Sequence, residues 1–387
     1  MIADALRAVP SLVATVALCA TAIGCECDAE AASEPAPTPA APRPALAALG
    51  PVSDAAAFAI TATSDGALVA WGDRERGGVI ARRVDPLGAA HGEPIHISDR
   101  DESRAREVEL AAQGAEVGVA WIASSDEGLR AMAAFSLDGG ARFSAPSPLE
   151  RSAGDASRGR LALTAHADAL VLYQRLEEAD CIASEGRCAR FTRRGIGPHA
   201  NDVERGTEPL EVEEPCEPFV AGAAYADGTH YHAVCHVEEG TPRTTVYAIR
   251  PAIAYAVPQR WDDCTPVALT ALRGAGVALV MRCDGELALS TLDEMGRVTR
   301  TLRPLVRQLG CRDGRPTLAL RGADDSLALE LGEAQDHLEA LLPEALAPAG
   351  SRAVWTGEAI LVARATDGSL ALARHVCSEA DDVDSDG

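Results

Sequence analysis

A repeating unit restricts the folds open to this chain more than any other feature of its sequence. Each unit holds an apolar segment, a turn with Gly or Asp-Gly, a second apolar segment, a short loop and a third segment. The second segments of the first three units end on Trp71, Trp121 and Tyr173, which are 50 and 52 residues apart. Short apolar runs rich in valine and bounded by Gly, Asp and Pro predict β-strands.

Four later units keep this order of segments but lose the aromatic residue. Their second segments are Thr229–His236, Val277–Met281, Ser326–Glu330 and Ala359–Ala363. The one stretch with a helical pattern is Asp336–Leu342. Since a small sheet of three or four strands cannot bury both faces alone, such units are expected to stack radially and share a core.

The sequence therefore predicts an all-β fold, a β-propeller over residues 52–377 with seven blades, or six as the alternative. A pair of packed sheets is the competing all-β solution, but a sandwich predicts no such period. Only 4% of the residues are aromatic, so alanine, valine and leucine must fill the core. Such a core suits many short, similar strands.

One turn resembles a known motif. Ser136, Asp138, Gly140 and Phe143 lie in Ser-Leu-Asp-Gly-Gly-Ala-Arg-Phe, which resembles the Asp-box, Ser-x-Asp-x-Gly-x-Thr-Trp, of sialidase-like propellers. Arg142 stands where that motif has threonine, and the terminal tryptophan is replaced by phenylalanine. In such a turn aspartate accepts hydrogen bonds from the backbone and glycine permits a left-handed residue. In that family the Asp-box is a structural device, so the resemblance implies the fold and not the chemistry.

The resemblance also raises an enzyme hypothesis. Degenerate copies of the turn occur at Val84–Gly88 and Leu292–Gly296. Sialidase-like enzymes resemble one another in an arginine triad, a Tyr–Glu pair and an aspartate, and the first arginine lies in the first blade. The corresponding segment here, Ala57–Thr61, has no arginine. We therefore expect no catalytic residues and no cofactor in a non-enzymatic binding or scaffolding module, with a sialidase-like glycoside hydrolase as the alternative.

The N-terminus predicts export. Ala8–Ile23 is mostly apolar and shorter than the ~20 residues of a membrane-spanning helix. The residues before Cys25 resemble a lipobox, so Cys25 is the predicted lipidation site. Cleavage after Ala22 by the ordinary signal peptidase, and hence secretion, is the alternative.

The segment after Cys25 is rich in alanine and proline, which favours an extended tether. We predict a signal peptide over 1–24, a disordered tether over 25–51 and an acidic tail over 378–387. The expected location is the cell envelope, with a lipid anchor as the only contact with the membrane. We expect a monomer whose partner is an unknown protein or glycan.

Cysteine usage agrees with export, because eight cysteines in the body fit disulfides of an oxidising compartment. They are Cys181, Cys188, Cys216, Cys235, Cys264, Cys283, Cys311 and Cys377. A zinc cluster would need close Cys-x-x-Cys pairs, and the sequence has none.

Local pairing is expected for these cysteines. Cys216 and Cys264 each precede a first strand, and each has a cysteine nineteen residues later at the end of the second strand. A hairpin brings those two positions together. Cys181 and Cys188 bracket a short loop. Cys311–Cys377 remains as the fourth pair, for which Cys27 can compete.

Charge excludes several functions. The formal net charge of −23 repels phosphate backbones and anionic lipids, which argues against nucleic-acid binding. The sequence contains no lysine, and high-GC codon usage is the simplest explanation. Without lysine the chain cannot form a Walker phosphate loop, a pyridoxal Schiff base or a Ser-x-x-Lys acyl-enzyme centre.

Two clusters have the composition of metal sites. His230, His232 and His236 share one face of a strand, but the first and last are separated by ~20 Å of extended chain, too far to share one ion. The tail residues Asp382, Asp384 and Asp386 resemble the start of a calcium loop, yet its glutamate at the twelfth position is missing. We expect a polar strand face and an acidic tail, and no metal site.

Overall fold

The structure is a computed structural model. It describes residues 47–98, 104–126, 128–149, 161–166, 169–178, 188–198, 206–213, 215–226, 229–249, 259–272, 276–312, 315–331 and 337–377. All of them belong to a compact unit that spans residues 44–387. The predicted lipidation site Cys25 and the acidic tail with Asp382, Asp384 and Asp386 lie outside the described residues.

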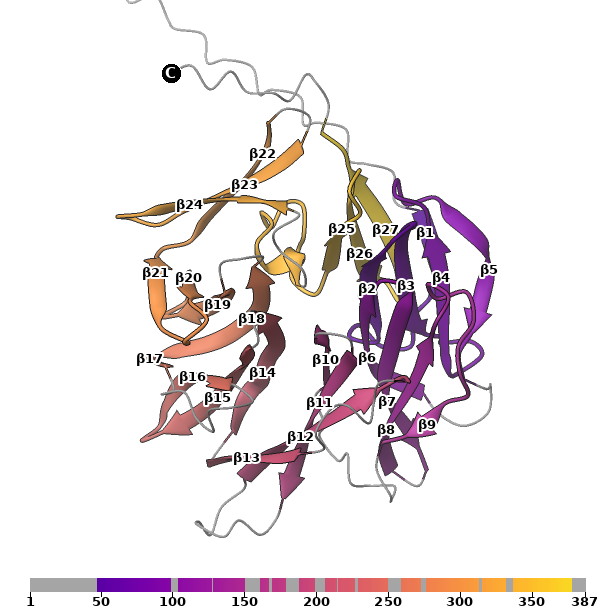
Figure 1. The fold of residues 1–387 in the computed structure, drawn as a ribbon, viewed down its shortest axis with the longest axis horizontal. Coiled ribbons are helices and arrows are strands. Elements are labelled where there is room, and N and C mark those ends of the chain that lie inside the picture. Colours follow the sequence, from indigo (N-terminus) through magenta and orange to yellow (C-terminus); the bar gives the residue numbers. More distant parts are fainter. Residues whose placement is uncertain are drawn as a thin grey trace, which may run out of the picture. The chain divides into compact units, whose positions relative to one another are not determined.

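The described residues form seven antiparallel sheets, numbered here in chain order (Figure 1). Sheet 1 contains β2 (Phe58–Thr63), β3 (Gly66–Gly72), β4 (Val79–Val84) and β5 (Ala90–His96). Sheet 2 contains β6 (Arg104–Gln113), β7 (Glu116–Ser125), β8 (Gly128–Ser136) and β9 (Ser147–Pro148). Sheet 3 contains β10 (Leu161–His166), β11 (Ala169–Glu178), β12 (Cys188–Ile196) and β13 (Gly206–Glu213).

The other four sheets follow in the same order. Sheet 4 contains β14 (Pro215–Ala226), β15 (Thr229–Glu238), β16 (Thr241–Ile249) and β17 (Gln259–Asp262). Sheet 5 contains β18 (Cys264–Leu272), β19 (Gly276–Cys283), β20 (Glu286–Leu292) and β21 (Val298–Leu302). Sheet 6 contains β22 (Val306–Arg312), β23 (Arg315–Arg321) and β24 (Ser326–Glu330), and a 3₁₀ turn, η2 (Leu338–Ala340), follows it. Sheet 7 contains β25 (Arg352–Trp355), β26 (Ile360–Thr366), β27 (Ser369–His375) and β1 (Ala47–Pro51).

Consecutive sheets contact one another through their first strands. β2 contacts β6, β6 contacts β10, β10 contacts β14 and β14 contacts β18. Sheets 5, 6 and 7 share one hydrophobic cluster, to which they contribute Leu289, Leu318 and Val362 respectively. Strand β25 of the last sheet contacts β2 of the first. Sheets that follow one another in this way and return to the first make an all-β propeller, as predicted.

An N-terminal strand completes the last sheet. Ala47–Pro51 pairs antiparallel with β27, and Val52 donates its backbone N–H to the carbonyl of Gly368 at 2.9 Å. The prediction that a disordered tether reaches residue 51 is therefore wrong for residues 47–51. A segment rich in Ala and Pro predicts an extended tether. Composition does not reveal that the backbone of this segment forms hydrogen bonds with the edge of β27.

The aromatic repeat is confirmed at two of its three positions. Trp71 and Trp121 each lie five residues after the first residue of their strand, which follows a two-residue hairpin turn, and each is 1% exposed. Tyr173 lies only four residues after Ala169, the first residue of β11. Its position along the strand therefore differs by one residue from that of the two tryptophans. Residues 326–330, predicted as a second strand, form the third strand of sheet 6. The helical pattern at 336–342 yields only the short η2 turn in the described part.

Three of the four predicted disulfides are present. Cys216–Cys235 and Cys264–Cys283 join the first two strands of sheets 4 and 5, with Cα–Cα distances of 5.3 and 4.1 Å. Cys311–Cys377 links β22 to the segment after β27, at 5.7 Å. The predicted Cys181–Cys188 pair is not described, because Cys181 and the side chain of Cys188 lie outside the described set. Disulfides of this number indicate an oxidising compartment.

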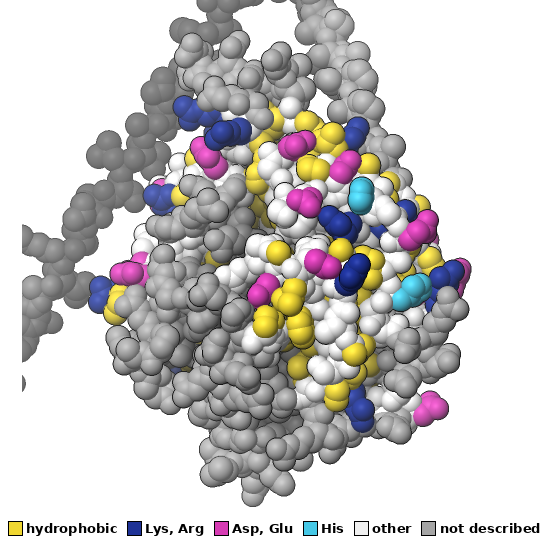
Figure 2. Space-filling model, turned by 45° about the vertical axis from the view of Figure 1, so that its right-hand side comes forward, with side chains coloured by type: hydrophobic (Ala, Val, Ile, Leu, Met, Phe, Trp, Pro, Cys, Tyr) yellow, Lys and Arg dark blue, Asp and Glu magenta, His cyan; other side chains and the backbone are white. Residues whose placement is uncertain are grey.

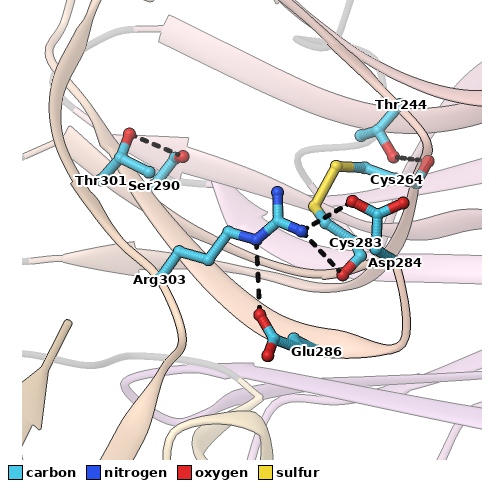
Figure 3. Close-up of a disulfide and its surroundings, with 8 residues drawn as sticks. All are labelled: Thr244, Cys264, Cys283, Asp284, Glu286, Ser290, Thr301 and Arg303. Atoms are coloured by element: carbon cyan, nitrogen blue, oxygen red, sulfur yellow. Dashed lines mark hydrogen bonds and ion pairs between the residues drawn. A yellow bond between two sulfur atoms is a disulfide. The ribbon is translucent and has the colours of Figure 1, made fainter. Parts of the chain in front are cut away.

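Figure 3 shows the surroundings of Cys264–Cys283, where polar contacts hold the ends of the hairpin. Arg303 donates to the carbonyl of Cys283 at 3.3 Å and to the carboxylate of Asp284 at 2.8 Å. Thr244 donates its hydroxyl to the carbonyl of Cys264 at 2.8 Å, which joins sheet 4 to sheet 5.

The same aspartate turn recurs in sheets 1, 2 and 5. The Oδ1 atoms of Asp85, Asp138 and Asp293 each accept a hydrogen bond from the backbone N–H four residues later, at 2.8, 2.9 and 2.8 Å. At Asp138 the hydroxyl of Ser136 also donates to Oδ1 at 2.8 Å, and this bond chiefly lowers the pKa of the carboxyl. Phe143 packs against the core, and Gly140 has φ +83°. The contacts of this turn are therefore hydrogen bonds within the turn itself and the packing of Phe143 on the core.

No helix in the described part of the chain is long and apolar enough to cross a membrane.

Candidate ligand site at the first strands

A cavity of about 320 Å³ lies where several first strands meet. Its wall comes from β6, β10, β18, β19, β20, β22 and β25, and from residues 337–351, which contain η2. Aliphatic side chains alternate on this wall with charged ones. These charged or polar side chains are Glu107, Glu109, Arg282, Arg307, His337, Glu339, Glu344, Ser351 and Arg352.

Strand alternation places the two acidic residues of β6. Glu107 and Glu109 are two residues apart, so they share one face of the strand, and that face lines the cavity. Val108 and Leu110 point the other way and are 0% and 7% exposed in the core. In the sequence Glu-Val-Glu-Leu the two apolar side chains fill the space between the sheets. The two carboxylates therefore face the cavity.

Arg352, the first residue of β25, lies between two carboxylates. Its Nη2 is 3.8 Å from Oε1 of Glu109, and its Nη1 is 3.7 Å from Oε1 of Glu339. Burial lowers the pKa of Arg352, but the charges of Glu109, Glu339 and Glu107 outweigh burial and raise it. Arg352 is therefore a fixed cation that joins β6, η2 and β25.

His337 extends this chain of charges. Its Nδ1 lies 3.3 Å from Oε1 of Glu339. Burial alone would lower the pKa of His337, but the hydrogen bond and charge of Glu339 raise it above 6.5. Burial likewise would raise the pKa of Glu339, but His337 and Arg352 bring it below 4.5. Near neutral pH Glu339 is thus an ionised carboxylate held between the guanidinium of Arg352 and the imidazole of His337.

Backbone contacts hold η2 against the strands. Glu339 accepts a hydrogen bond from the backbone N–H of Ala353 at 3.1 Å, and Arg307 donates to the carbonyl of Ala340 at 3.0 Å. His337 itself has φ 52°, a left-handed conformation that is uncommon for a residue with a Cβ. The short segment is therefore fixed from both sides, and the strained residue faces the cavity.

Two buried polar atoms at the cavity wall find no hydrogen-bond partner among the described residues. They are Oγ of Ser351, a residue 1% exposed, and Nε of Arg352. A buried donor without a partner costs about 1–3 kcal/mol. Buried polar atoms without a partner also occur away from this cavity in the described part, at Trp71 and Thr245 for example, so these two atoms alone do not mark a ligand.

A second cavity of about 30 Å³ lies on the other side of the same side chains. Glu109, His337, Glu339 and Arg352 line both cavities, and β2 contributes to the smaller one. The four side chains therefore form a charged partition between the two spaces. Figure 2 shows one face of the described surface, on which acidic and basic side chains lie interspersed among apolar ones.

Among the predicted site residues that the structure describes, none lines this cavity. The Asp-box residues form their turn in sheet 2, and the three disulfides lie in or between sheets 4 to 7. His232 is buried in β15, and His236 lies 3.7 Å from Glu238, while the side chain of His230 is outside the described set. Within the described ranges no group of three His, Cys, Asp or Glu could hold a metal ion.

No family model matches this chain, and no curated protein matches it. Solved structures are similar at low identity. A Trypanosoma rangeli sialidase in complex with sialic acid is 10% identical over 77% of this chain and 57% of the sialidase, with a TM-score of 0.39. A polysaccharide lyase, an ulvan lyase, is 9% identical over 78% of this chain and 83% of the lyase, with a TM-score of 0.39.

A puromycin hydrolase is 14% identical over 83% of this chain and 54% of the hydrolase, with a TM-score of 0.41. This chain therefore spans a little more than half the length of the sialidase and of the puromycin hydrolase.

Proposed function

We propose that the cavity beside Arg352 is a binding site for a small polar molecule, and that binding it is the function of the propeller. One observation carries the proposal: charged side chains from β6, η2 and β25 converge on a cavity of about 320 Å³. Small-molecule sites have volumes of about 300–1,000 Å³. Ion pairs that only linked the strands would need no adjacent space of this size.

Blocking the cavity mouth tests this proposal. Val267 lines the cavity and is 42% exposed, so Val267→Trp places a large side chain at the mouth without disturbing the core. Val298 is 39% exposed on another strand of the same sheet and away from the cavity, which makes Val298→Trp the matched control.

Amino acids, dipeptides, neutral monosaccharides and sugar acids serve as probes in thermal-shift measurements on the three proteins. At least one class is expected to raise the Tm of the wild type and of Val298→Trp, but not of Val267→Trp. The proposal is overturned if no class raises the Tm, or if Val267→Trp responds as the wild type does.

Hydrolysis is the second candidate, and the state of Glu339 favours it. Glycoside hydrolysis uses two carboxyl groups, one ionised and one protonated. Glu339 fits the ionised role because His337 and Arg352 lower its pKa. Glu109, which is 8% exposed, stands on the other side of Arg352 and is the second carboxyl group at this site. The described lining has no tyrosine, so this site offers no Tyr–Glu pair of the sialidase kind.

Activity toward 4-nitrophenyl glycosides tests this candidate. A hydrolase at this site would release nitrophenol, and Glu339→Gln would abolish the release, whereas Glu358→Gln, at an exposed residue away from the cavity, would retain most of it. Equal activity of wild type and Glu339→Gln would contradict a role for this carboxylate.

The lipid anchor is a separate proposal, supported by the lipobox-like residues before Cys25 and by the disulfides of an exported body. The body would then be held at the cell envelope as a monomer. Palmitate labelling in the expressing bacterium is expected for the wild type and absent for Cys25→Ser. Labelling that persists in the variant would contradict it.

A further inference from the structure

Three exposed aliphatic side chains occupy equivalent places in the fold. Leu87, Leu137 and Met295 are 38%, 55% and 40% exposed. Each lies at the aspartate turn that joins the third strand of its sheet to the fourth, in sheets 1, 2 and 5. These are the turns of this kind that the structure describes in full. Single exposed apolar residues are common, but one at each equivalent turn is a regular pattern.

Contacts with the preceding sheet place the three turns at one end of the ring. A Cβ at Gly140, in the turn of sheet 2, would lie 3.0 Å from Leu68 of sheet 1. Tyr231 of sheet 4 donates its hydroxyl to the carbonyl of Asp293, in the turn of sheet 5, at 2.6 Å. The carbonyl of Pro86, in the turn of sheet 1, accepts a hydrogen bond of 2.8 Å from the threonine between β25 and β26. Each turn thus rests on the same end of the sheet before it. This end, with Leu87, Leu137 and Met295, is here called the turn face.

The segment before the propeller joins the fold at the turn face. Ala47, the first residue of β1, pairs with Leu372 near the end of β27. Because β27 is the third strand of sheet 7, it ends on the same side as the three turns. Val376, which follows β27 there, is 50% exposed. A lipid anchor at Cys25 would therefore connect to the body through this face.

The cavity opens at the other end of the sheets. Val267 lies near the start of β18, and Arg282 and Leu287 flank the turn between the second and third strands of sheet 5. In an antiparallel sheet this turn lies opposite the one that joins the third and fourth strands. A body whose turn face rested on a surface would thus direct its cavity away from that surface.

The charges of the turn face do not favour anionic lipid. Exposed acidic and basic residues lie together on its turns, among them Asp65, Glu294, Glu358, Arg142 and Arg297. The net charge of the whole chain is −23. A negatively charged bilayer would repel such a body, whereas aliphatic side chains enter the headgroup layer of a zwitterionic bilayer without that cost.

We infer that the turn face rests on a bilayer of zwitterionic phospholipid, with Leu87, Leu137 and Met295 in its headgroup layer and the cavity directed away from it. Three partly exposed side chains bind weakly by themselves. A lipid anchor raises their effective concentration at the bilayer, so that weak contacts suffice to orient the body. This inference rests on the lipid anchor proposed above and adds a second contact to the anchor that the sequence predicts.

A tryptophan at each end of the body reports its orientation. Leu137→Trp places one on the turn face, and Val306→Trp places one at the start of β22, where the exposed fraction is nearly the same at 57%. The full chain, purified with its lipid, is reconstituted in phosphatidylcholine vesicles with and without brominated acyl chains, and the wild-type emission is subtracted. Bromine is expected to remove roughly half or more of the added emission of Leu137→Trp and to leave that of Val306→Trp nearly unchanged.

A combined variant shows whether the new tryptophan enters the bilayer by itself. Leu137→Trp with Leu87→Ser and Met295→Ser is expected to lose most of the quenching, because two of the three apolar contacts are gone. Undiminished quenching would overturn the role given to the turn face. Replacing phosphatidylcholine by phosphatidylglycerol is expected to lower the quenching, and a rise would contradict the zwitterionic surface.

Flotation of the vesicles separates this inference from the lipid anchor. If the wild type floats but Leu137→Trp is quenched no more than Val306→Trp, the anchor stands and the orientation is wrong. If Cys25→Ser floats as the wild type does and Leu137→Trp is quenched, the turn face binds lipid and the anchor proposal fails. If the wild type does not float, both fail.

Discussion

The guanidinium of Arg352 lies 3.8 Å from the carboxylate of Glu109, and this contact joins sheet 7 to sheet 2 across the first strand of sheet 1. Glu109 is 8% exposed and the side chain of Arg352 is 32% exposed, so the carboxylate is withdrawn from water and the guanidinium only partly so. Removing one member of a buried pair leaves the other charge uncompensated, which costs more than the pair itself contributes.

Arg352→Met is accordingly expected to lower the free energy of unfolding by about 3 kcal/mol. Urea unfolding followed by tryptophan fluorescence measures the loss. The double variant Glu109→Gln/Arg352→Met should recover part of it, because one buried charge is removed as well. Arg297→Met, at an exposed arginine, is the control. A loss within about 0.5 kcal/mol of this control would contradict the role given to the pair.

The pH dependence of stability follows from His337 and Glu339. The raised pKa of His337 adds stability that is complete below 6.5 and is lost as the pH rises through the folded-state pKa above it. The lowered pKa of Glu339 adds stability that is complete above 4.5 and is lost as the pH falls through the folded-state pKa below it.

The difference in unfolding free energy between wild type and His337→Gln should therefore be greatest between 4.5 and 6.5 and should shrink above 6.5. Urea titrations across this range measure the difference. A difference that grows as the pH rises above 6.5 would have the wrong sign.

Gly140 tests the close contact between sheets 1 and 2. Its φ is +83°, and a Cβ there would lie 3.0 Å from both Cδ atoms of Leu68, which is fully buried. Gly139 has φ +67° and open space around the same position. Gly139→Ala should cost about 1 kcal/mol for the left-handed backbone alone, and Gly140→Ala distinctly more. Equal costs would show that Leu68 moves aside freely.

The disulfides differ in the length of chain that they close. Cys311–Cys377 closes 66 residues and Cys264–Cys283 closes 19. Loop-closure entropy predicts about 4 kcal/mol for the first and about 3 kcal/mol for the second. Urea unfolding of the two Cys→Ser double variants measures both. A larger loss for the shorter loop would argue against an entropic role for the long one.

Periodicity predicted much of the fold because the repeat is a property of local sequence. The spacing of Trp71 and Trp121, and of Cys264 and Cys283, follows from hairpins whose register is fixed by short turns. Pairing between distant segments left no such signal. The strand at Ala47–Pro51 exists because β27, more than 300 residues later, offers it an edge.

The candidate site was missed for the same reason. Glu109, Glu339 and Arg352 come from three separate segments, and no spacing in the sequence relates them. One local signal was present, because Glu107 and Glu109 alternate with buried apolar residues along β6. Their carboxylates therefore share the strand face opposite the apolar one. Only the assembled sheets bring an arginine and a histidine to that face.

A crystal structure of the chain grown with the probe class that raises its Tm tests the central claim most directly. The account predicts the probe in the cavity, beside Glu339 and Arg352. A cavity that holds only solvent at a saturating concentration of that probe would contradict it.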